Sequence, residues 1–196
     1  DAARKALVLG LALSTAYIGW SLTAKTLVDR QAERRLAAMG LQDAPRFSVP
    51  APFTTLLWRV VAMTPDGFVE GERSLVADRG PMVFRAHRSD TDALRAVASQ
   101  PAVARLAWFN RGFMKAEQRD GALVLSDLRM GSEPDYTFRF AVAERDGAGW
   151  RATPPRQLQW PWQATQRLEA LWQRIWREPA LAQSTAPSAA APSTAH

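Results

Sequence analysis

Three charged residues occupy positions where strand periodicity expects apolar side chains, and they are the first candidates for chemistry. Alternation along residues 122–130 places Asp127 and Arg129 on the same predicted strand face as two leucines. Arg59 shares a predicted face with apolar neighbours at positions 57, 61 and 63. The pattern suits a polar pocket in which Arg59 or Arg129 grips an anionic group while Asp127 orients it.

The same three residues also have a structural interpretation. An ion pair between neighbouring strands specifies their register and performs no chemistry. We favour this interpretation and keep Arg59, Asp127 and Arg129 as the candidate pocket residues. With no other recognisable active site, the sequence leaves open whether this segment is itself an enzyme.

Metal and nucleotide chemistry find little support in the composition. The chain has no cysteine and only two histidines, His87 and His196, so a metal cluster would depend wholly on carboxylates. His87 has no carboxylate or serine partner that the sequence establishes, and no Gly-rich phosphate loop is present. We therefore expect no cofactor and no metal in this segment.

Four aromatic residues invite a ligand-stacking interpretation. Aromatic side chains of this kind more often fill cores, and we expect the same here. The four residues are Trp58, Trp108, Phe109 and Phe113.

An antiparallel sheet is expected to position these residues. Two hairpins are predicted, one turning at Thr64-Pro65-Asp66-Gly67 and one at Asp120-Gly121. Prolines 45, 50 and 52 indicate an extended segment leading into the first hairpin. Apolar or alternating stretches predict the strands, which cover residues 56–63, 68–75, 82–86, 113–119, 122–130 and 136–144, with a short return strand after Asp146-Gly147.

Helices complete an α+β domain over residues 41–178. Ser89 or Asp90 can cap a first helix, and Pro101 can begin a second one. Residues 162–177 have an apolar stripe that includes Leu168 and Trp172; it is expected to pack on the sheet, with an interfacial membrane helix as the alternative. From residue 179 the chain is rich in Ala, Pro, Ser and Thr, and the tail 179–196 is expected to be disordered.

The stretch from Ala6 to Ala24 contains no charged side chain and predicts a membrane span. At about 1.5 Å per residue it covers roughly 29 Å, close to the hydrocarbon thickness of about 30 Å. The helical pattern continues to Gly40, so residues 1–40 are expected to form one helix that leaves the bilayer and continues into solvent. A buried core helix and a signal peptide are the alternatives. The small-xxx-small pairs around Gly10 and Gly19 predict packing against further spans.

The distribution of charged residues indicates a side of the membrane and does not indicate a nucleic-acid ligand. The formal net charge is +6, but the arginines are scattered among acidic residues and no nucleic-acid-binding motif is present, so no nucleic-acid partner is expected. Basic residues after the span outnumber those before it, which favours the cytoplasmic side for the domain.

Several separate blocks of sequence resemble the C-terminal part of the bacterial inner-membrane metal-dependent hydrolase family. The similarity extends over roughly Ala6 to Trp150, and Thr54 departs from it where the family favours Asn. The blocks are Pro50-Ala51-Pro52-Phe53, Leu56-Leu57-Trp58-Arg59-Val60-Val61, Leu106-Ala107-Trp108-Phe109, Gly112-Phe113, Asp127-Leu128-Arg129-Met130-Gly131 and Phe138-Arg139-Phe140.

The resemblance implies a longer, multi-pass inner-membrane protein whose divalent-metal ligands lie upstream in other spans. The start at Asp1 rather than Met fits such a segment. On this hypothesis the chain is the last span and an extramembrane accessory domain, and its partners are the lipid bilayer and the upstream helices. A membrane-anchored binding or scaffolding domain without catalysis is the alternative.

Overall fold

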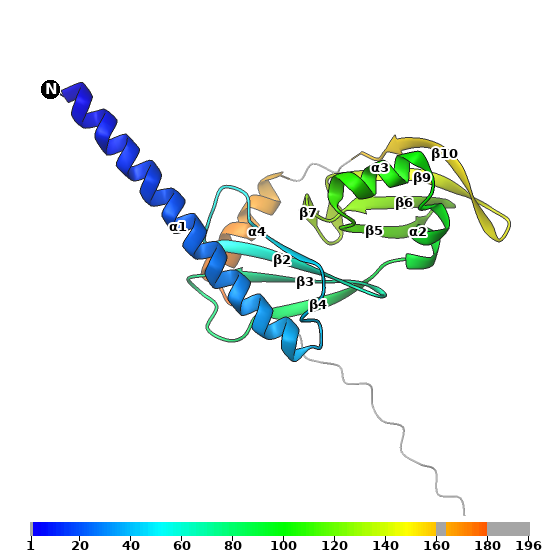
Figure 1. Ribbon diagram of the computed structural model, residues 1–196, viewed down its shortest axis with the longest axis horizontal. Helices are drawn as coiled ribbons and strands as arrows, with labels where there is room; N and C mark the ends of the chain where they lie inside the picture. The colour runs from blue at the N-terminus through cyan, green and yellow to red at the C-terminus, as the bar shows by residue number, and fades with distance from the viewer. Residues whose placement is uncertain (1, 160–163, 180–196) are drawn as a thin grey trace, which may run out of the picture.

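The computed structural model describes residues 2–159 and 164–179, and these form an α+β structure as predicted (Figure 1). A long N-terminal helix is followed by two four-stranded antiparallel sheets and further helices. The expectation of a disordered tail falls outside the described residues from position 180 onward.

Helix α1, Ala2–Ala38, has two different halves. Every described residue from 2 to 20 is exposed, and in Figure 1 this half projects away from the rest of the chain. The second half does not continue into solvent as expected. It packs on the first sheet through a stripe of side chains spaced four residues apart, which a helix places on one side: Ala24, Val28, Ala32 and Leu36.

The first sheet, sheet A, has the strand order β1-β2-β3-β4 and is antiparallel throughout. The first predicted hairpin is present, with Thr64 paired to Gly67. The extended segment predicted before it forms the edge strand β1, which the sequence did not identify as a strand. The strands are β1 Arg46–Pro50, β2 Leu57–Thr64, β3 Gly67–Ser74 and β4 Val83–Arg88.

The two faces of sheet A contact different parts of the chain. Trp58 and Val60 lie on the face that packs against the second half of α1. Val61 and Phe68 lie on the opposite face, where they pack with Phe113, Leu128 and Tyr136 from the second sheet region. Sheet A is therefore the element that joins the α1 helix to the rest of the domain.

The second sheet, sheet B, has the order β10-β9-β6-β5, and two helices pack on it. Asp90 caps the first helix by accepting a hydrogen bond from the Ala93 N–H, and Pro101 begins the second, both as predicted. The elements are α2 Thr91–Val97, α3 Pro101–Asn110, β5 Met114–Arg119, β6 Ala122–Asp127, the short pair β7 Gly131–Ser132 and β8 Asp135–Tyr136, β9 Arg139–Asp146 and β10 Gly149–Gln157.

Two strand predictions differ from the structure, one in its length and one in its continuity. The strand expected over 122–130 ends at Asp127, because the carboxylate of Asp127 accepts the backbone N–H of Arg129 and closes a turn. Arg129 therefore does not lie on the strand face predicted for it. The strand expected over 136–144 is divided between β8 and β9.

The aromatic predictions were correct for two residues and wrong for two. Trp58 and Phe113 are buried, whereas Trp108 is 81% exposed and Phe109 is 59% exposed. Helix α3 turns its buried side inward through Val103 and Asn110, and the seven-residue spacing of these two leaves positions 108 and 109 on the outside.

Helix α4, Ala164–Trp176, crosses the end of sheet A beside β2 and β3 (Figure 1). Its expected start at Trp162 lies outside the described residues. Only part of its apolar stripe packs on the sheet as predicted: Ile175 is buried, whereas Leu168 and Trp172 are exposed.

Candidate functional site

Arg59 lies at the junction between sheet A and the sheet B region. The hairpin register places it opposite Glu72 and diagonal to Glu70 on the same face. Its Nη2 donates to Glu70 Oε2 at 2.6 Å, and its Nη1 donates to the carbonyl oxygen of Leu128 at 2.6 Å. The side chains of Arg59 and Glu70 are only 8% and 11% exposed, so this is a buried ion pair between neighbouring strands.

Two aromatic rings enclose the Arg59 guanidinium. Its carbon lies 5.8 Å from the ring centroid of Phe47 and 5.9 Å from that of Tyr136, within the range of cation–π attraction. The Tyr136 hydroxyl also donates to Glu70 Oε2, at 3.3 Å. Burial, together with the nearby Glu70 carboxylate, raises the pKa of Tyr136 far above its usual value. Tyr136 therefore acts as a hydrogen-bond donor in this cluster.

A second charged group continues along the same face toward α4. Arg174 of α4 forms an ion pair with Asp78 at 2.6 Å and lies 3.4 Å from Glu72. Desolvation raises the pKa of Glu72 above its usual value of 4.5, and the positive charge of Arg174 opposes that shift only in part. The ion pair with Asp78 holds α4 against sheet A.

Asp127 and Arg129 form a separate local pair. The Asp127 side chain is 1% exposed; it accepts the Arg129 backbone N–H at 2.9 Å and the Arg129 Nη2 at 3.3 Å. The Arg129 guanidinium lies 4.8 Å from the ring centroid of Phe109, which explains how an exposed aromatic residue is partly covered. The pair stabilises the turn after β6.

The structure thus brings Arg59 close in space to the segment that holds Asp127 and Arg129, but it does not pair Arg59 with either residue. Arg59 reaches Leu128, the residue between Asp127 and Arg129, but binds its carbonyl oxygen. Each arginine has its own carboxylate partner, Glu70 for Arg59 and Asp127 for Arg129. A guanidinium that binds an anionic ligand here would have to exchange one of these contacts.

Sequence reasoning missed Glu70, Tyr136 and Arg174. For Glu70 the signal was available: the predicted turn between Thr64 and Gly67 fixes the register, and the register puts Arg59 beside the acidic residues of β3. Tyr136 and Arg174 come from elements distant in sequence, and no local pattern indicates their position.

The remaining candidates show no catalytic arrangement. His87 on β4 stacks on Phe68 with ring centroids 5.1 Å apart. Among the described residues, no group of three or more His, Cys, Asp or Glu side chains is arranged to hold a metal ion.

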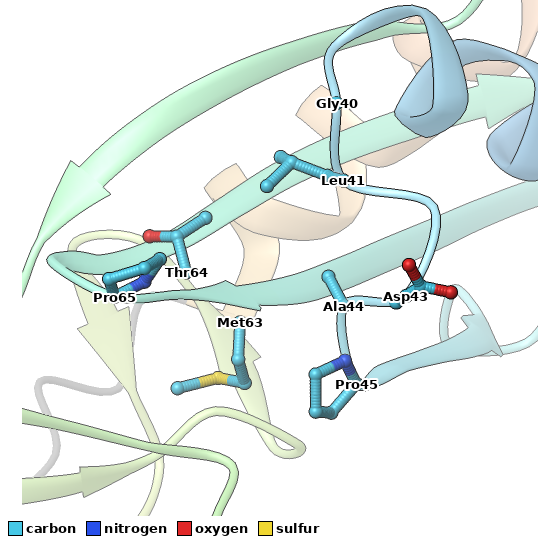
Figure 2. A pocket seen from close by; sticks show the side chains of 8 residues that line it. All are labelled: Gly40, Leu41, Asp43, Ala44, Pro45, Met63, Thr64 and Pro65. Carbon is cyan, nitrogen blue, oxygen red and sulfur yellow. The ribbon is translucent and has the colours of Figure 1, made fainter.

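An open hollow lies between the end of α1 and the β2–β3 turn (Figure 2). Its polar side chains are the Asp43 carboxylate and the Thr64 hydroxyl, and none of the three predicted site residues lines it. Its walls are Gly40, Leu41, Asp43, Ala44, Pro45, Met63, Thr64 and Pro65.

Within the described residues, α1 is the one helix that is long and apolar enough to cross a membrane. None of its most apolar stretch is buried against the rest of the chain. Comparison with protein-family models, with curated proteins and with solved structures finds no match to this chain.

Proposed function

We propose that the chain is a membrane span joined rigidly to an extramembrane accessory domain of an inner-membrane protein. The observation that carries this proposal is the contrast within α1. The half around Leu7, Leu11 and Leu13 exposes 62–74% of each leucine, whereas Val28 and Leu36 in the other half are fully buried. Exposed leucines on an uncharged helix are stable in lipid and unfavourable in water.

The junction between the two halves favours a retained span over a removable signal peptide. The Trp20 indole donates to Thr55 Oγ1 at 3.0 Å, and Ala24 is fully buried against sheet A. These contacts continue the span directly into the folded domain. Cleavage at this point would disrupt contacts that the domain uses.

The enzymatic part of the proposal rests on the resemblance to the inner-membrane metal-dependent hydrolases. The whole protein would hold a divalent metal in spans upstream of this segment, and this domain would cover or regulate that site. No residue of this chain is proposed as a metal ligand.

A second candidate is a membrane-anchored binding or scaffolding domain without catalysis. The ion pairs favour it, because Arg59 and Arg129 are held by carboxylates of the chain itself. Buried pairs of this kind can serve to specify the packing of the sheets alone.

A comparison of two proteins separates these candidates. The protein that includes the upstream spans, and this segment alone, are purified and assayed for divalent metal and for hydrolysis of generic phosphoester and ester substrates. We expect metal and hydrolysis in the longer protein only. A longer protein without metal, and without clustered His and Asp upstream, would overturn the hydrolase proposal and leave the scaffolding one.

A further inference from the structure

We infer that the domain has a second contact with the bilayer, separate from the α1 span. The contact is an apolar surface, the docking surface, made by Phe53 of the β1–β2 loop and by Leu168, Trp172 and Trp176 of α4. Its occupant is the headgroup region of the same bilayer that α1 crosses. The inference rests on the proposed membrane anchorage and extends it to the orientation of the domain.

The β1–β2 loop holds the Phe53 ring fully in the open on a left-handed backbone. Phe53 is 96% exposed and its backbone is left-handed, with φ 61°. That conformation costs a residue with a side chain roughly 1–2 kcal/mol, and no burial within the chain offsets it. The loop is nevertheless ordered by its own hydrogen bonds, because the Ala51 N–H donates to Leu57 at 2.8 Å and the Leu56 N–H donates to Thr54 Oγ1 at 3.0 Å.

The loop lies at the level where α1 leaves the lipid. Trp20, near the end of the uncharged stretch, donates its indole N–H to Thr55 Oγ1 at 3.0 Å. Figure 1 shows the loop extending beside α1 beyond the end of sheet A. Tryptophan at the end of a span favours the membrane–water interface, which places Phe53 at the same depth.

Helix α4 lies at the same end of sheet A as the loop. The Ser74 hydroxyl donates to the carbonyl oxygen of Ile175 at 2.6 Å, and Ser74 pairs with Leu57, the first residue after the loop. In Figure 1 the axis of α4 crosses that of α1. If α1 spans the bilayer, α4 therefore lies along its surface.

An exposed apolar stripe runs along one edge of α4, next to the polar residues that face away from sheet A. Leu168, Trp172 and Trp176 recur every four residues and are 45%, 63% and 54% exposed. Arg174 lies on the other side of the helix and donates to the carbonyl oxygen of Glu72 in β3. Ile175, seven residues after Leu168, belongs to the same stripe and is buried where the stripe meets sheet A. A helix with tryptophans on one side and in the plane of the interface inserts that side about 5–10 Å into the headgroup boundary.

The continuity with α1 identifies a bilayer as the occupant. The docking surface begins at Phe53, two residues before the Thr55 that Trp20 binds, so any bilayer around the span reaches it without a further partner. A comparable exposed pair, Trp108 and Phe109, lies on α3 in the sheet B region and is not linked to the span. That pair serves as an internal control.

Single-cysteine labelling tests the inference, because the chain contains no cysteine. The variants Leu13→Cys, Phe53→Cys, Trp172→Cys and Trp108→Cys are labelled with an environment-sensitive fluorophore. Each is reconstituted in vesicles of phosphatidylcholine and phosphatidylglycerol that contain spin-labelled lipids with quenchers at different depths. The spectrum in detergent-free vesicles and the quenching by each lipid are measured.

We expect deep quenching at position 13, shallow quenching with a blue-shifted emission at positions 53 and 172, and neither effect at position 108. Quenching at 13 with water-like probes at 53 and 172 would overturn the docking surface and leave the span intact. A water-like probe at 13 would overturn the proposed span itself. Equal quenching at 108 would show non-specific adsorption of the domain and would also overturn the inference.

Discussion

The two halves of α1 show one helix adapted to two surroundings. Its first half exposes large apolar side chains along the whole stretch that lacks charge, whereas its second half is charged outside and buries a narrow stripe of small and apolar residues. Lysine and aspartate on the second half bind β1, where the Lys25 ammonium donates to Ser48 Oγ at 2.6 Å and Ser48 donates to Asp29. A helix in lipid needs only an apolar surface. A helix packed on a sheet also needs a stripe whose side chains match the shape of the sheet surface.

The largest effect is expected when the same substitution, alanine to aspartate, is made in each half of α1. Ala32 is fully buried against sheet A, and Ala16 is exposed near the centre of the proposed span. We expect Ala32→Asp to lower the free energy of unfolding by about 4 kcal/mol, because an unpaired carboxylate would enter the core. Urea unfolding in mild detergent, followed by near-UV circular dichroism, measures it.

Ala16→Asp is the matched control. It should leave the unfolding curve of the domain unchanged, and should weaken membrane retention by about 2.5–3.5 kcal/mol, the insertion cost of aspartate at a helix centre. Equal loss of domain stability in both variants would contradict the division of α1 into two halves.

On the face of sheet A opposite α1, the core contains a charged side chain, Arg59, that is paired with Glu70. Arg59→Ala leaves Glu70 buried without its main partner, and we expect a loss of about 3 kcal/mol in urea unfolding. The double variant Arg59→Met with Glu70→Gln should recover most of that loss, since it removes both charges. A double variant as unstable as the single one would show that the ion pair itself stabilises the fold.

Arg129→Ala should have a smaller effect, about 1 kcal/mol or less. The Arg129 side chain is 30% exposed, and Asp127 keeps the backbone N–H of residue 129 as a donor. If Arg129 belongs to a binding pocket, this variant weakens activity or ligand binding in the longer protein more than it lowers the melting temperature. A loss of activity no larger than the loss of thermal stability explains would instead support the ion-pair interpretation.

Local chemistry explains which parts of the fold could be predicted from the sequence. The turn at Pro65-Asp66 and the cap at Asp90 are set by residues within a few positions of each other, so both hairpins and α2 were identified. The strand ending at Asp127 was predicted too long, because alternation alone does not show that a side chain will close a turn.

Tertiary contacts decided the rest. The edge strand β1 forms because β2 offers it hydrogen bonds, whereas its prolines predicted only an extended segment. Trp108 and Phe109 are exposed because Val103 and Asn110 select the buried side of α3. For the candidate site, Arg59 was identified as a buried charge, but Tyr136 and Arg174 reach its face of sheet A from distant elements.

Phe53 lies near the point where α1 passes from its exposed half to its buried half. The strain of its left-handed backbone can be removed by substitution. Phe53→Gly removes a left-handed strain of roughly 1–2 kcal/mol but adds unfolded-state entropy of about 0.5–1 kcal/mol. We expect a net gain of about 0.5–1 kcal/mol in urea unfolding. Phe53→Ser is the control: it removes the ring and keeps the strain, so it should give no gain.

The smallest expected effect concerns Glu72. Its ionised carboxylate is destabilised by desolvation although it lies near Arg174 of α4. Its pKa is raised in the folded state, so its contribution to stability is complete below pH 4.5 and is lost as pH rises through the folded pKa. Glu72→Gln should therefore stabilise the domain more at pH 7 than at pH 4. The same substitution at the exposed Glu169 corrects for the change in net charge. A stability difference that does not change with pH, or that favours Glu72 at pH 7, would mean that Arg174 outweighs the desolvation and that α4 is held to sheet A by attraction to Glu72 as well as to Asp78.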